Sequence, residues 1–167
     1  MGTLKTQEAA GFGSRLRRLL ERLDREVSAV YRAAGQRFEP RWYAVFVALR
    51  DEGPLTVGEL SQRLGVTHAA VSQVRTALEH EGLIRVEPDS QDGRRHILSL
   101  TRRGRATARR LAPLWTAIAT AMSGILARHA PTLLDDLTAL ENALDRRGLL
   151  ARVNASFHLE GLDDDSD

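Results

Sequence analysis

The segment from residue 55 to 104 constrains the fold more than any other part of the chain, because two short helical patterns in it meet at a glycine. In the first pattern Val57, Leu60 and Leu64 recur at intervals of three and four residues, which places them on one face of a helix. Gly65 then permits the positive φ that a tight turn between two helices needs. The pattern predicts a helix-turn-helix.

The second helix of this pair is expected to begin at about His68, with Thr67 as its N-cap. Val71, Val74 and Leu78 form its inward stripe, so the opposite face points outward. That face carries short polar side chains and no acid, and such a surface fits the major groove of DNA. The predicted DNA-binding residues of this helix are Thr67, His68, Ala69, Ser72, Gln73 and Thr76.

These side chains are suited to different parts of the duplex. Gln73 has the amide geometry to pair with adenine through two hydrogen bonds, whereas Ser72 and Thr76 can bond either a base or a phosphate. Thr67 and the first free N–H groups of the helix are expected to meet a phosphate. The helix is therefore predicted to read DNA sequence.

A β-hairpin is predicted to follow. Residues 83–87 and 96–100 alternate in polarity like half-buried strands, and Asp92-Gly93 between them is a strong turn signal. The turn carries Arg94 and Arg95, whose guanidinium groups suit the concentrated negative potential of a narrow minor groove. The order of parts predicts a winged helix-turn-helix with a basic wing tip.

The run from residue 92 to 104 resembles the wing signature of the MarR transcriptional regulators, Asp-x-Arg-x-x-x-Leu-x-Leu-Thr-x-x-Gly. The matching residues are Asp92, Arg94, Leu98, Leu100, Thr101 and Gly104. By this resemblance Arg94 enters the minor groove and Asp92 orients a neighbouring arginine, while Gln73 stands where many members carry a basic residue. The similarity in layout extends from roughly residue 12 to 150.

Long helices are predicted on both sides of the winged module. Apolar residues repeat at heptad-like spacing within residues 12–35, and further leucine-rich patterns run through residues 105–152, with Pro113 as an expected kink and Pro131 as a helix start. Such seams need a partner, so we expect a homodimer that binds an inverted-repeat operator. The expected fold is mainly α with a small β-hairpin wing, a single domain over residues 11–158.

Charge is local along this chain. The formal net charge is only +2, yet residues 94–110 hold seven arginines and no acid, which favours a nucleic-acid partner. Residues 1–10 are expected to be disordered, and residues 159–167 to form an acidic tail. The chain has no cysteine, no evident signal peptide and no apolar run of membrane-spanning length, so a cytoplasmic protein without a membrane partner is expected.

A cluster of aromatic residues precedes the winged module, and an arginine lies beside it. We expect these residues either to line a pocket for a small aromatic anion, as the MarR resemblance implies, or to pack as ordinary core between the first helices. The candidate ligand-binding residues are Tyr31, Arg41, Trp42, Tyr43 and Phe46.

Catalytic and metal-binding patterns have little support in the sequence. The five histidines are scattered, and no metalloprotease, nucleophile-elbow or phosphate-loop motif is present. We therefore expect no enzyme activity, no metal and no cofactor. The predicted function is a DNA-binding repressor relieved by a small ligand, and the alternative is a winged-helix module that docks an acidic protein partner.

Overall fold

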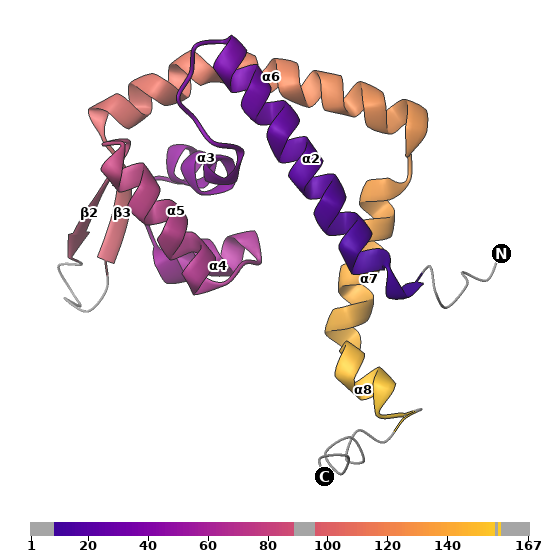
Figure 1. Ribbon diagram of the computed structural model, residues 1–167. Helices are drawn as coiled ribbons and strands as arrows, with labels where there is room; N and C mark the ends of the chain where they lie inside the picture. Colours follow the sequence, from indigo (N-terminus) through magenta and orange to yellow (C-terminus); the bar gives the residue numbers. More distant parts are fainter. Residues whose placement is uncertain (1–8, 89–95, 156, 158–167) are drawn as a thin grey trace, which may run out of the picture. The chain divides into compact units, whose positions relative to one another are not determined.

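The computed structural model describes residues 9–88, 96–155 and 157. Helices dominate it, together with three short strands (Figure 1). Before the winged module lie α2 (Phe12–Ala33), the 3₁₀ helix η1 (Pro40–Trp42) and α3 (Tyr43–Asp51). The winged module adds β1 (Leu55–Thr56), α4 (Val57–Leu64), α5 (His68–His80), β2 (Ile84–Pro88) and β3 (His96–Leu100). The chain then continues through α6 (Arg102–His129), α7 (Leu133–Arg146) and α8 (Leu149–Val153).

The chain divides into two compact units, residues 1–115 and 116–167, with the division inside α6. The single domain over residues 11–158 that is expected from the sequence counts all the leucine-rich helices as one body and stays a prediction. Ala9 and Ala10 are helical, so the expected disordered N-terminus does not include them. The rest of that segment and the whole acidic tail lie outside the described residues.

The helix-turn-helix is confirmed at its predicted residues. Gly65 ends α4 with φ of 63°, a left-handed conformation that favours glycine. The Ser61 hydroxyl donates to the Val66 carbonyl at 2.5 Å and holds the turn closed. At the start of α4, the Thr56 hydroxyl accepts from the Glu59 N–H while the Glu59 carboxylate accepts from the Thr56 N–H. This capping box uses Glu59, which the sequence pattern places only on a solvated face.

The hairpin strands form a three-stranded antiparallel sheet in the order β1-β3-β2. Val86 lies opposite Leu98 and Ile84 opposite Leu100, and three of these four residues, all but Val86, are buried. Strand β2 begins one residue later than the alternation predicts. Strand β1 is not predicted at all, because two residues are too few to show a period.

Thr101 and Gly104 join the sheet to α6. The Thr101 hydroxyl accepts from the Gly104 N–H at 2.9 Å and donates to the Gly82 carbonyl at 2.7 Å. A Cβ at Gly104 would lie 2.0 Å from the carbonyl oxygen of Leu83. Buried Leu98 and Leu100 complete the group. Much of the wing signature is therefore structural, since these residues fix the sheet against the start of α6.

An aromatic cluster fills the centre of the first unit. The Phe38 ring lies 5.3 Å from the rings of Tyr31 and Phe46 and 5.7 Å from that of Trp115. The Trp115 indole N–H donates to the Tyr31 hydroxyl at 2.9 Å, so its polar atom is satisfied inside the core. Burial raises the pKa of Tyr31. This cluster ties α2 to α3 and to the first half of α6.

Helix α6 continues through Pro113. In the described part of the chain it is the one helix that length and composition would allow to cross a membrane. Of its most apolar window, 11% is buried. The sequence predicts no such segment, because it contains no unbroken apolar run of about 18 residues. Leu111 and Trp115 of α6 are packed in the core of the first unit.

Candidate DNA-binding surface

Helix α5 presents the predicted reading face to solvent. Thr67, Ala69, Gln73 and Thr76 are exposed and Ser72 is half-buried, whereas Val71 and Leu78 of the opposite face are buried. The structure thus confirms which face of α5 is outward and brings these predicted residues together on it. Their contact with DNA remains a prediction.

The start of α5 has the geometry of a phosphate site. The Thr67 hydroxyl accepts from the Ala70 N–H at 3.2 Å, which confirms Thr67 as the N-cap. The N–H groups of His68 and Ala69 precede that bond and have no carbonyl four residues back within the helix. Such N–H groups, at the positive end of the helix dipole, favour an anion.

Side-chain hydrogen bonds change what two of the predicted residues can offer. The Thr76 hydroxyl donates to the Ser72 carbonyl at 3.0 Å within α5, so it keeps acceptor capacity but has used its proton. Gln73 is the exposed residue of this face with both an amide donor and an amide acceptor. The arrangement makes Gln73 the strongest candidate for reading a base.

Asp92, Arg94 and Arg95 lie outside the described residues, which end at Pro88 and resume at His96. Their proposed roles therefore rest on the sequence resemblance. The adjacent strand β3 is described, and it pairs antiparallel with β2 from Ile84–Leu100 to Pro88–His96.

A basic cavity of about 630 Å³ lies between α3, the sheet and the start of α6. Its walls carry four arginines, Arg50, Arg85, Arg105 and Arg109. The Arg50 guanidinium bonds the Asp51 carboxylate at 2.5 and 2.8 Å, which lowers the pKa of Asp51. The sequence does not predict this cavity, because its arginines come from three separate elements and only Arg105 and Arg109 share helical spacing.

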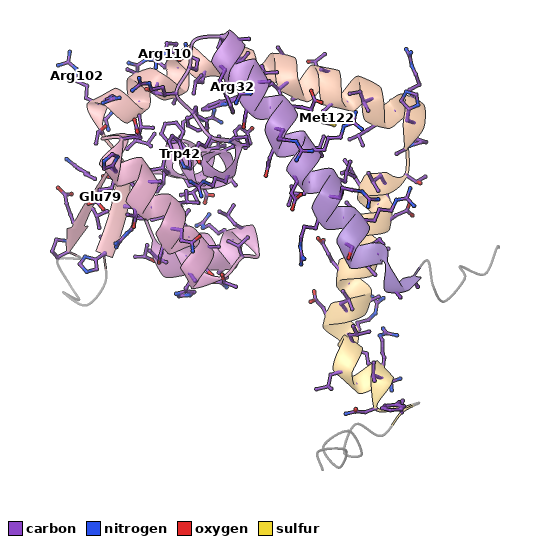
Figure 2. All side chains as sticks on the ribbon, viewed as in Figure 1. Arg32, Trp42, Glu79, Arg102, Arg110 and Met122 are labelled. Carbon is purple, nitrogen blue, oxygen red and sulfur yellow. The ribbon has the colours of Figure 1, made fainter. Side chains whose placement is uncertain are left out.

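The five candidate ligand residues do not form one site. Tyr31, Trp42 and Phe46 are at most 5% exposed and belong to the aromatic cluster, which matches the core alternative for them. Tyr43 is 43% exposed, and Arg41 bonds Glu39 at 2.6 Å on the surface. Tyr31 and Trp42 also line a smaller cavity of about 350 Å³, which does not include the other three. Figure 2 shows Trp42 among the helices of the first unit.

Within the described ranges, no group of three or more histidine, cysteine or acidic side chains is arranged to hold a metal ion. His68 lines a cavity with Arg75 and His96. The acid that lines this cavity is Glu59, and its carboxylate already caps α4.

Two kinds of comparison with known proteins find similarity to the same family. The model of the MarR family matches residues 38–95. No curated protein matches the chain. Among solved structures, a MarR family regulator from Neisseria meningitidis is 26% identical over 82% of this chain and 93% of its own, with a TM-score of 0.56.

Two further structures share the fold. The PcaV transcriptional regulator from Streptomyces coelicolor, solved in complex with its natural ligand, is 26% identical over 88% of this chain and 99% of its own, with a TM-score of 0.62. The transcriptional regulator MOSR from M. tuberculosis, solved in complex with DNA, is 22% identical over 80% of this chain and 95% of its own, with a TM-score of 0.65.

Proposed function

We propose that this chain is a homodimeric winged-helix repressor of the MarR type that binds an inverted-repeat operator, because the MarR family model matches residues 38–95 and solved regulators share its fold. Regulators of this family are DNA-binding transcription factors and not enzymes. The observation that carries the proposal is the exposed face of α5 with Ala69, Gln73 and Thr76, none of them acidic, which follows a capped N-terminus. A similar fold in complex with DNA supports it.

Dimerisation is supported by apolar surface that this chain leaves uncovered. Described residues from Thr116 onward include none that is buried. Large apolar side chains are exposed on α2, α6 and α7, among them Phe12, Leu20, Ile125, Leu140 and Leu144. Exposed apolar seams of this extent mark interaction surfaces. A second copy is the partner that gives twofold symmetry, so each half of an inverted repeat would meet one α5.

Base reading by Gln73 can be separated from phosphate contact. We expect Gln73→Ala to relax the preference for one base pair in each half-site, with a loss of about 1–3 kcal/mol on the preferred sequence and little loss on a mismatched one. Thr67→Ala is the matched comparison, because loss of a phosphate contact should weaken all sequences alike. The measurement is binding to a panel of duplexes with single mismatches, after selection of bound sites from random DNA.

The rival function is a winged-helix surface that docks an acidic protein. It predicts retention on acidic proteins and on any duplex, with no preference among sequences. Selective, salt-sensitive binding to one family of duplexes would exclude this rival. If selection from random duplexes enriches no sequence, the proposed repressor function is wrong.

We further propose that a small anionic ligand relieves DNA binding in the cytoplasm. The fold is that of a regulator solved with its natural ligand, which supports a ligand site in this chain. The cluster of aromatic side chains around Tyr31 and Phe46 is packed as core and offers little open ring surface. A ligand is better accommodated where charge and open volume coincide.

A further inference from the structure

A second cavity lies on the wing side of α5, between the first turns of α4, the flank of α5 and the start of β3. Its volume is about 560 Å³. The polar side chains that line this histidine cavity are Thr56, Glu59, Gln62, His68, Arg75 and His96. They come from separate elements, so only the folded winged module brings them together.

The histidine cavity borders the predicted reading face of α5. At 100° per residue, His68 and Arg75 lie on the same flank of the helix. This flank separates the exposed side of Gln73 from the buried side of Val71. When a helix occupies the major groove and a wing approaches the minor groove, the DNA backbone between the two grooves passes between helix and wing. A phosphate of that backbone would therefore meet this cavity.

Arg75 supplies a positive charge that the winged module leaves unpaired. Its Nε atom is buried and has no hydrogen-bond partner among the described residues. A buried polar atom without a partner is uncommon in native folds and calls for an acceptor. Phosphate and carboxylate oxygens are the acceptors that guanidinium groups bind most strongly.

The histidines decide the net charge of the cavity. Glu59 is the acid among the lining residues, and its carboxylate accepts from the Thr56 N–H at 2.7 Å in the capping box. Its charge offsets that of Arg75. Histidine side chains change charge between about pH 5 and 8. The lining is therefore formally neutral at the upper end of this range, and it becomes positive when His68 and His96 gain protons.

His68 is exposed and packs against the first turn of α4. Its Cε1 atom lies 3.7 Å from the position of a Cβ at Gly58, which is an ordinary van der Waals contact. The charged groups on the same flank of α5 are Arg75, which lines the cavity, and Glu79, which does not. This contact places the ring at the cavity wall, and its exposure allows it to exchange a proton with solvent.

His96 is exposed as well, at the start of β3, where it lies opposite Pro88 of β2. Glu87, the acid of β2, is on the other face of the sheet, because successive strand residues alternate between the faces. The charged groups that line the cavity with His96 are Arg75 and Glu59. No acid of β2 therefore faces a protonated His96.

We propose that the histidine cavity binds a phosphate of the DNA backbone, and that protonation of His68 and His96 strengthens this contact. Arg75 supplies a charge that is present at every pH. A phosphate favours the protonated imidazoles, so DNA binding takes up protons and the affinity rises as pH falls. The inference rests on the proposed DNA-binding function and adds to it a backbone site that is separate from the N–H groups at the start of α5.

The first test measures affinity for a random-sequence duplex, because a backbone contact acts on every sequence. Fluorescence anisotropy at about pH 8 and about pH 6, at one ionic strength, should show at least about fivefold tighter binding at the lower pH. The His68→Gln/His96→Gln double variant should change by less than about twofold. Both residues are exposed, so glutamine should leave the fold intact, and circular dichroism at each pH checks this.

His80→Gln is the matched control. His80 is the last residue of α5, its side chain is 87% exposed, and it does not line the cavity. This variant should keep the wild-type dependence on pH. A wild-type affinity that does not change with pH would overturn the proposal. A double variant that keeps the full dependence, or a His80→Gln protein that loses it to the same extent, would overturn it as well.

Arg75 has a separate readout. Arg75→Gln should weaken binding to all duplexes alike and reduce the slope of log affinity against log salt by about one, as expected for one lost phosphate contact. Arg75→Lys keeps the charge and should recover most of that slope. An unchanged slope in Arg75→Gln, or a loss confined to one sequence, would overturn the phosphate contact of Arg75.

Failure of this site and failure of the repressor function give different results. If selection from random DNA enriches no sequence, the repressor function is wrong, and the pH dependence on the random-sequence duplex still decides the histidine cavity. If an operator is selected but neither it nor the random-sequence duplex is bound more tightly at about pH 6 than at about pH 8, only the histidine cavity is refuted.

Discussion

The winged module and the C-terminal unit of this chain are both largely helical, but they differ in how much of their apolar surface they bury. In the winged module Leu60, Leu78 and Leu98 are fully buried, and each comes from a different element. In the C-terminal unit, α7 and α8 contain no buried residue. The winged module completes its own core within one chain, whereas the leucines of the C-terminal unit need a second surface.

The two regions also differ in how their helices begin. Helices α4 and α5 begin at threonines whose hydroxyls accept backbone hydrogen bonds. Helix α7 begins at Thr132, whose hydroxyl makes no such cap and donates to the Asp136 carboxylate instead. Side-chain caps therefore fix the starts of α4 and α5 in the winged module. The C-terminal helices depend more on packing.

The largest expected effect is the substitution of Gly104, at the start of α6 beside the winged module. Gly104→Ala places a Cβ 2.0 Å from the backbone oxygen of Leu83, so the sheet or α6 must shift. We expect a loss of about 3 kcal/mol in the free energy of unfolding, at the upper end of the usual cost of overpacking. Denaturant unfolding followed by circular dichroism measures it.

Gly124→Ala is the control for this change. Nothing lies within 4 Å of a Cβ built at Gly124. The alanine should therefore stabilise α6 by up to about 1 kcal/mol, through its helix propensity. Opposite signs for the two substitutions would support the contrast between a tightly packed winged module and an open C-terminal unit, and equal losses would contradict it.

The next effect concerns the uncovered leucines. Leu140 is exposed on α7 and belongs to the apolar seam predicted from the sequence. Leu140→Glu should place a charge in the proposed dimer interface and weaken dimerisation by about 2 kcal/mol, or roughly thirtyfold in Kd. Sedimentation velocity over a range of concentrations measures the dissociation.

Asn142→Glu adds the same charge two residues away on α7, at an exposed position outside the leucine seam. It should leave the dimer nearly unchanged. A Leu140→Glu protein that remains as dimeric as the Asn142→Glu protein would show that α7 is not part of the interface.

Sequence reasoning is most successful where one residue decides a local conformation. Gly65, Thr67 and the alternation in β3 place the helix-turn-helix and the hairpin correctly, because each is a local signal. It misses β1, because Leu55 and Thr56 form a strand only through their pairing with β3. It also misses the basic cavity, since the convergence of Arg50, Arg85 and Arg105 depends on tertiary packing that no periodicity reports.

The aromatic residues show a further limit of the sequence. Hydrophobicity predicts that Tyr31, Trp42 and Phe46 cluster, but a pocket and a core have the same composition. Their exposed fractions of 2%, 5% and 0% favour the core. The sequence can thus predict that residues meet without predicting whether space remains between them.

The smallest expected effect compares two helix starts, one in each region. Thr56 belongs to the capping box of α4, in which its hydroxyl accepts from the Glu59 N–H at 3.2 Å and donates to the Glu59 carboxylate at 2.8 Å. Thr56→Ala should cost about 1 kcal/mol, the usual cost of losing an N-cap side chain. Thr132→Ala removes the same atoms at the start of α7 without removing a backbone cap, so its effect should stay within about 0.5 kcal/mol. Thermal unfolding of the two variants under the same conditions decides between them, and a Thr132→Ala loss equal to that of Thr56→Ala would mean that the C-terminal helices are held by their ends as firmly as the winged module.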